Sequence, residues 1–171
     1  MDYFIIHQDE RIILDIAKPK PESLYLQVLT REEMQAIPRT IAINLQESGQ
    51  NQYIDYIEKP IKLVSEKLKQ IMSKYQSDII FKTAVLLEKK KNRQEIYYLL
   101  SVPQIDCAST ETVYDMYGNV REFVLDEKKT GQSRIFSVSG YGTRIIVRLD
   151  VAESILRRSS YGIVFEKVKT A

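Results

Sequence analysis

The sequence predicts an α+β protein with a mainly antiparallel sheet, one long helix near 60–75 and a C-terminal helix near 150–158. Three observations lead to this prediction. Short runs rich in isoleucine, valine and tyrosine recur along the chain, and such side chains favour strands. Pairs of these runs are joined by short polar or glycine-containing segments, which is typical of antiparallel hairpins. The two helical segments instead place their apolar residues on one face at helical spacing.

The length and composition indicate a single α+β domain over 1–171. A domain of this size buries about 70% of the surface that its unfolded chain exposes, so it can fold without disulfides or metals. The alternative is a weak subdivision near residue 76. It would separate a mixed N-terminal part, 1–76, from a strand-rich C-terminal part, 77–171.

The N-terminal part is expected to combine short strands with one short helix. The first strand is expected at 3–7, and 12–16 is a second apolar run. Thr30 and Glu33 have the spacing of a capping box, in which each side chain bonds the other residue's amide. Pro38 is expected to end this helix, because proline lacks the backbone donor. A strand candidate at 40–45 and a polar loop at 47–52 follow.

The helix near 60–75 has the clearest pattern in the chain. Pro60 suits its first turn, where the missing N–H has no intrahelical partner in any case. One face of the segment carries the apolar residues Ile61, Val64, Leu68, Ile71, Met72 and Tyr75. Such a stripe is expected to pack on a sheet rather than to stay exposed.

The C-terminal part is expected to be rich in hairpins. Two runs, 79–87 and 96–102, flank a lysine-rich segment at 88–95, which is expected to be a solvated hairpin loop. The alternative for this segment is a phosphate-binding patch, although no aromatic residue is interleaved with its lysines. Further strands are expected at 120–125, 134–139, 143–149 and 163–168, with a glycine turn at Gly140, Tyr141 and Gly142.

The helix near 150–158 has its own end signals. Asp150 is expected to be its cap, with Glu153 at the third helical position. Ala152, Ile155 and Leu156 are expected to form its apolar face.

Residues that usually carry catalysis or bind metals are scarce. His7 is the single histidine and is expected to be an ordinary strand-end residue. Cys107 is the single cysteine and is expected to be a partly buried structural thiol, because its neighbours include no base or cation to activate it. One histidine and one cysteine cannot build a zinc site of the usual nitrogen and sulfur type. Gly140 and Gly142 lack the third glycine of a dinucleotide fingerprint. We therefore assign no catalytic residue, cofactor or metal.

Charge and hydropathy limit the partners and the compartment. The net charge of +2 is too small to indicate a nucleic-acid-binding face. The N-terminal apolar run is short and has no basic segment before it, so no signal peptide is expected. No apolar stretch approaches the ~20 residues that cross a bilayer. Together with the single cysteine, these features predict a cytoplasmic protein that binds neither nucleic acid nor a membrane.

A set of segments in the C-terminal half occurs in a distinctive order. The segments are 96–102 (IYYLLSV), 104–108 (QIDCA), 124–128 (VLDEK), 135–140 (IFSVSG), 145–148 (IIVR), 152–156 (AESIL) and 162–168 (GIVFEKV), with 53–60 (YIDYIEKP) upstream. The set resembles the eleventh immunity-protein family of bacterial polymorphic toxin systems over about residues 53–168. Members often have an Asp-Ala-Leu-Asp-like stretch where this chain has Asp106, Cys107, Ala108 and Ser109, so the second acidic position is lost.

The resemblance implies a non-catalytic immunity protein that binds and neutralises a cognate bacterial toxin. Binding of this kind needs a complementary patch, and tyrosines are common anchors in such patches. The candidates in or beside expected loops are Tyr53, Tyr56, Tyr114, Tyr117 and Tyr141. Two alternatives remain: a small hydrolase-like enzyme with a scattered polar site, and a general protein-interaction module.

Overall fold

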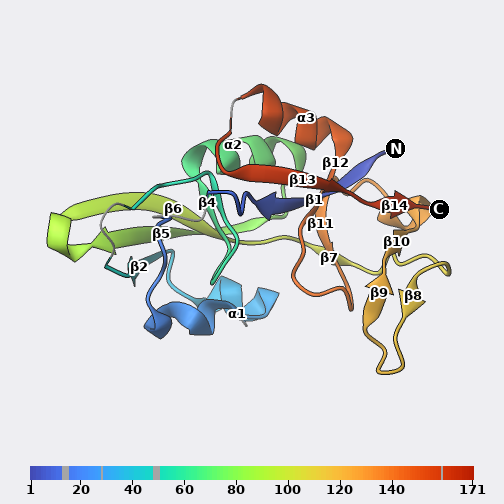
Figure 1. Ribbon diagram of the computed structural model, residues 1–171, viewed down its shortest axis with the longest axis horizontal. Coiled ribbons are helices and arrows are strands. Elements are labelled where there is room, and N and C mark those ends of the chain that lie inside the picture. The colour runs from blue at the N-terminus through green and yellow to red at the C-terminus, as the bar shows by residue number, and fades with distance from the viewer. Residues whose placement is uncertain (13–15, 28, 48–50, 159) are drawn as a thin grey trace.

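The computed structural model describes residues 1–171 except 13–15, 28, 48–50 and 159, and it has the mixed helix and sheet content expected of an α+β protein (Figure 1). The N-terminal elements are β1 (Tyr3–Gln8), η1 (Pro21–Gln27), α1 (Arg31–Ala36), β2 (Thr40–Asn44), β3 (Tyr56–Ile57), β4 (Leu63–Ser65) and α2 (Glu66–Tyr75). The middle elements are β5 (Ile80–Glu88), η2 (Lys89–Lys91), β6 (Arg93–Ser101), β7 (Gln104–Ile105), β8 (Val113–Tyr114), β9 (Val120–Glu122) and β10 (Val124–Leu125). The last are η3 (Glu127–Thr130), β11 (Ile135–Val138), β12 (Ile146–Arg148), α3 (Leu149–Arg157), β13 (Ile163–Lys167) and β14 (Lys169–Thr170).

Two five-stranded sheets form the frame of the described residues. The first has the strand order β13-β1-β12-β11-β7 and the second the order β2-β5-β6-β4-β3. Most neighbouring strands run antiparallel, as expected from the hairpin pattern. The pairs β2–β5, β7–β11 and β10–β14 are parallel. In each pair a long stretch of chain separates the two strands, as a parallel connection requires.

The core consists of three clusters, because successive side chains of a strand point to opposite faces of its sheet. On β1, Ile6 belongs to the cluster that includes residues of α2 and α3. Tyr3 and Ile5 point to the opposite face and belong to the cluster that includes a residue of β10. On β6, Leu100 faces the helices and Leu99 faces a second cluster covered by η1 and α1. Each large sheet is therefore covered on both faces.

The helices α2 and α3 connect the two sheets. They pack against each other, with α2 on β4 and β6 and α3 on β1 and β12 (Figure 1). The cluster beneath them combines Val64 and Leu68 with Ile135 and Val151. These residues come from both sides of residue 76, where the sequence suggested a weak subdivision.

The predicted start of the helix near 60–75 is wrong by about six residues, since the helix begins at Glu66. The preceding residues form β4, in which Leu63 pairs with Leu99 and with Ile57. Ser65 then caps the helix, and its Oγ accepts a hydrogen bond from the Leu68 amide at 3.2 Å. The apolar residues keep helical spacing through both β4 and α2, so the sequence pattern does not show the boundary between the strand and the helix.

The C-terminal helix is confirmed at Leu149–Arg157, but its predicted cap and apolar face need correction. Asp150 lies inside the first turn and is bound by the Arg148 side chain at 2.6 and 2.9 Å. This bond holds the pKa of the Asp150 carboxyl below its usual value. Ala152 and Ile155 are buried, whereas Leu156 is 63% exposed.

The other predicted elements lie close to their expected positions. The capping box is present, with the Glu33 amide 3.2 Å from Thr30 Oγ1 and the Thr30 amide 2.7 Å from Glu33 Oε2. The strand expected at 120–125 is divided into β9 and β10. The middle of the apolar run at 12–16 and of the loop at 47–52 lies outside the described residues.

Candidate partner-binding surface

The hairpin formed by β8 and β9, residues 113–122, projects away from the two large sheets (Figure 1). Val113 pairs with Glu122 and Tyr114 with Val120. Arg121 is the extra residue between these pairs, and such a bulge increases the local twist of the hairpin. A two-stranded ribbon is marginally stable by itself, so its turn and its base must support it.

The turn of the hairpin is built around Asp115. Its backbone amide donates to the Asn119 carbonyl at 2.8 Å, and its Oδ1 accepts from the amides of Tyr117 and Asn119 at 2.8 and 2.9 Å. These hydrogen bonds lower the pKa of the Asp115 carboxyl. Gly118 has a φ of +83°, which a glycine adopts without strain. The tip is thus ordered by its own hydrogen bonds.

The side chains presented by this ordered turn are apolar. Met116 is 87% exposed and Tyr117 82% exposed, while Tyr114 and Val113 are about half exposed. Contiguous exposed apolar side chains of this kind mark interaction surfaces, because their exposure to water is unfavourable and a partner can bury them. Methionine and tyrosine are also residues that adapt to and anchor interfaces.

The base of the hairpin is fixed in the core. Phe123 is 7% exposed and stacks on Tyr141 with ring centroids 4.4 Å apart. Thr112 Oγ1 donates to the Val124 carbonyl at 3.0 Å and accepts from the Val124 amide at 3.2 Å. The Arg144 guanidinium lies 4.4 Å from the centroid of the Tyr141 ring. The exposed tip therefore stands on a packed support.

The five tyrosines selected from the sequence separate into different environments. Tyr114 and Tyr117 share the β8–β9 hairpin, and Tyr141 is half-buried at its base. Tyr53 is also half-buried, but it lies elsewhere and donates to Glu88 at 3.0 Å. The expectation of an accessible loop position is wrong for Tyr56, which is 1% exposed on β3.

Sequence reasoning missed Val113 and Met116, because it did not predict a hairpin at 113–122. A signal was available. Asp115 with Gly118 is a typical turn combination, and it is flanked by a Val-Tyr pair and by a strand-forming segment from Val120.

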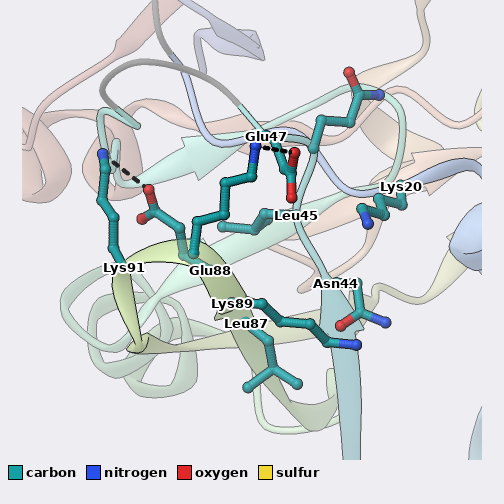
Figure 2. A pocket seen from close by; sticks show the side chains of 10 residues that line it. Lys20, Asn44, Leu45, Glu47, Leu87, Glu88, Lys89 and Lys91 are labelled. Atoms are coloured by element: carbon teal, nitrogen blue, oxygen red, sulfur yellow. Dashed lines mark ion pairs between the residues drawn. The ribbon is translucent and has the colours of Figure 1, made fainter.

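The lysine-rich turn that joins β5 and β6 forms a charged surface, unlike the apolar tip of the β8–β9 hairpin (Figure 2). Lys90 pairs with Glu47 at 2.6 Å, and Lys91 pairs with Glu88 at 2.9 Å. The cavity beside them has a volume of only ≈ 90 Å³. Because carboxylates already compensate two of the lysines, the geometry favours the expected solvated loop over a phosphate-binding patch.

A large cleft of ≈ 1220 Å³ opens between the η1–α1 segment and the ends of β6, β7 and β11. Half-buried Lys62 lies in it and donates to Thr143 Oγ1 at 2.8 Å. Burial lowers the pKa of Lys62, and the cations Arg144 and Lys59 lower it further, against the opposing effect of Glu58. A hydroxyl beside such a lysine is an arrangement that fits the hydrolase alternative.

His7 and Cys107 have structural surroundings. His7 Nε2 lies 2.9 Å from Glu166 Oε2, and its Nδ1 lies 3.4 Å from Glu58 Oε1. Cys107 is fully buried, and burial raises the pKa of its thiol to about 11, so a reactive thiolate is disfavoured. Among the described residues, no cluster of three or more His, Cys, Asp or Glu could hold a metal ion. None of the helices described there is long and apolar enough to cross a membrane.

Comparison with known proteins assigns the chain to a family. No curated protein matches it. A family model described as an immunity protein family, Imm11, matches residues 29–170. The match begins upstream of the segment recognised from the sequence and includes α1, β2 and the whole of both helices α2 and α3. Because it covers most of the 171 residues, the chain belongs to the Imm11 immunity protein family, whose role is to neutralise a toxin.

Proposed function

We propose that this immunity protein neutralises its cognate toxin by stoichiometric binding without catalysis, and that the β8–β9 hairpin is the main contact. The observation that carries the proposal is the ordered turn at Asp115, which presents the exposed side chains of Met116 and Tyr117. A preorganised apolar tip loses little conformational entropy when it binds. It can therefore serve as an anchor in a cleft of the toxin.

The rest of the interface would surround this anchor. A stable protein–protein contact buries about 800 Å² on each partner, which is more than one hairpin tip supplies. The flanking exposed side chains of Val113, Tyr114 and Arg121 extend the surface along the hairpin. Charged residues at the edge of such a surface contribute more to orientation and association rate than to affinity.

We also propose that the protein works in the cytoplasm. The free, buried thiol of Cys107 is consistent with a reducing compartment. We infer no membrane or nucleic-acid partner, since the charge excess is small and two of the lysines at the β5–β6 tip are paired with carboxylates.

Co-expression with a toxin candidate encoded beside this gene tests the function. We expect growth to be rescued in proportion to the dose of the immunity protein and a one-to-one complex to be recovered. Absence of both rescue and complex would refute the proposal.

The hydrolase alternative is favoured by the contact between Lys62 and Thr143 in the large cleft, and it has a separate test. Thr143→Val removes the hydroxyl but leaves the cation. Stoichiometric binding predicts that this variant, like the wild type, rescues growth only near one equivalent. Rescue by a small fraction of one equivalent of the wild type, abolished by Thr143→Val, would favour the enzyme.

A further inference from the structure

The cleft between the η1–α1 segment and the first sheet is larger than a small-molecule site. Ligand pockets usually enclose about 300–1,000 Å³, whereas this cleft encloses ≈ 1220 Å³. Its walls come from distant parts of the chain, including Leu29, Lys62, Gln104 and Arg144. A cleft of this volume can hold a polypeptide segment.

Three neighbouring cations, Lys59, Lys62 and Arg144, line the cleft together with Glu58, and Arg31, Glu10 and Glu32 also line it. The lowered pKa of Lys62 reflects its burial and the proximity of the other two cations, against the opposing effect of Glu58. Within the described residues, none of the three forms an ion pair within 4.0 Å. Lys62 donates instead to the neutral hydroxyl of Thr143.

Glu58, whose charge acts on Lys62, also has neutral and histidine partners. Glu58 Oε2 accepts from the Gln8 amide at 3.1 Å, and Oε1 lies 3.4 Å from His7 Nδ1. Arg144 is held in place by its bond to the Tyr141 carbonyl at 2.9 Å. Lys62 and Arg144 are therefore held in place, with Lys59 near them, and an anionic group that enters the cleft beside these three cations would be stabilised.

A strand edge also lines the cleft. β7 is the last strand of the first sheet, and its Gln104 lines the cleft. The carbonyls of Pro103 and Ile105 accept from the amides of Ser137 and Ser139 on β11. The backbone N–H and C=O of Gln104 consequently point away from β11, where an extended chain can pair with them.

We propose that this cleft binds an extended, acidic segment of the toxin as a second contact, separate from the β8–β9 hairpin. That the segment belongs to the toxin rests on the proposed function. Its extended form and negative charge are inferred from the strand edge and the cations of the cleft. Carboxylates of the segment face Lys59, Lys62 and Arg144, and its backbone lies along β7.

The test uses a fluorescein-labelled peptide of about six residues that alternates glutamate and leucine, since alternate side chains of a strand share one face. We expect saturable binding in fluorescence anisotropy. Binding should be lost at about 1 M NaCl, where the Debye length is about 3 Å. A lysine–leucine peptide of the same length should not bind. Equal binding of both peptides, or no binding of either, would overturn the proposal.

Variants identify the cleft as the binding site. Lys62→Met removes a charge that faces the ligand and Lys59→Glu reverses one, so each should weaken peptide binding by about tenfold or more. Lys128→Glu is the matched control on an exposed lysine outside the cleft, and it should change binding by less than about twofold. Equal effects of Lys59→Glu and Lys128→Glu would contradict the assignment. Displacement of the peptide by millimolar inorganic phosphate would instead indicate a site for small anions.

A hairpin variant separates this inference from the proposed function. Tyr117→Ser lies outside the cleft and should leave peptide binding unchanged. If the wild-type protein binds the peptide but not the toxin, the cleft is retained and the proposed function fails. If the toxin binds but no peptide does, the cleft assignment fails alone.

Discussion

The β8–β9 and β5–β6 hairpins differ in what supports them and in what they expose. β5 and β6 pair over nine residues in the middle of the second sheet, and their tip carries lysines compensated by Glu47 and Glu88. The β8–β9 hairpin pairs over a few residues outside both large sheets and exposes Met116 and Tyr117 at its tip.

This difference shows which surface feature is informative. Charged side chains at a hairpin tip remain solvated at little cost, so the lysines need no partner to explain them. Large apolar side chains held outward by an ordered turn are unfavourable in water. The conspicuous lysine run thus has a structural explanation, whereas the less conspicuous Met-Tyr pair calls for a binding partner.

The largest effect is expected at the base of the β8–β9 hairpin. Phe123→Ala removes a buried ring and its stacking on Tyr141, and it should lower the free energy of unfolding by about 3 kcal/mol. Urea denaturation measures this change. Phe123→Leu, the control, should cost less than about 1.5 kcal/mol. A loss below about 1 kcal/mol in Phe123→Ala would mean that the base is not anchored as described.

The next effect concerns the tip itself. The double variant Met116→Ser and Tyr117→Ser should weaken toxin binding by about 2 kcal/mol or more, roughly 30-fold, because both side chains would lose their buried position in the complex. Both are exposed in the free protein, so its denaturation midpoint should not fall. Titration calorimetry measures the affinity. Wild-type affinity in this variant would exclude the tip as an anchor.

A smaller effect is expected from the turn. Asp115→Asn keeps the size of the side chain but weakens the hydrogen bonds from Tyr117 and Asn119, and it should reduce affinity about threefold through lost preorganisation.

The same carboxylate gives a pH dependence. The folded pKa of Asp115 is lowered, so its contribution is present above the ordinary value near 3.8 and is lost as the pH falls through the lower folded value. In the wild type, hydrogen exchange of the Tyr117 and Asn119 amides should therefore remain slow at all pH values above about 4. Fast exchange of these amides at neutral pH would contradict the ordered turn.

The smallest effect is expected at the β5–β6 tip. Lys90→Ala removes an exposed ion pair with Glu47 and should change toxin affinity by less than about twofold, because such pairs contribute little. It is the matched comparison for the tip variant of the other hairpin. A loss of affinity equal to that of the Met116 and Tyr117 double variant would reverse the roles of the two hairpins.

Much of the fold followed from local patterns in the sequence. β1, β2, the β5–β6 hairpin and the capping box at Thr30 were predicted because their signals depend on neighbouring residues. The beginning of α2 was not, because Leu63 takes its strand conformation from pairing with Leu99, which is far away in the sequence. The parallel pairs of β2 with β5 and of β7 with β11 depend on similarly distant contacts.

The candidate site was predicted only in part. Tyr114 and Tyr117 were selected because they lie near expected loops, and the structure places them on one hairpin. The same criterion selected Tyr56, which is buried. Sequence position near a loop does not determine exposure, since exposure depends on what the rest of the chain packs over the residue. The cleft around Lys62 could not be predicted, because residues from five separated segments form it.

Hydrogen–deuterium exchange on the complex with the cognate toxin compares the two hairpins in one measurement. We predict slower exchange across 113–122 on binding and unchanged exchange across 88–93. Protection of 88–93 with none at 113–122 would contradict the proposal that the β8–β9 hairpin carries the toxin contact.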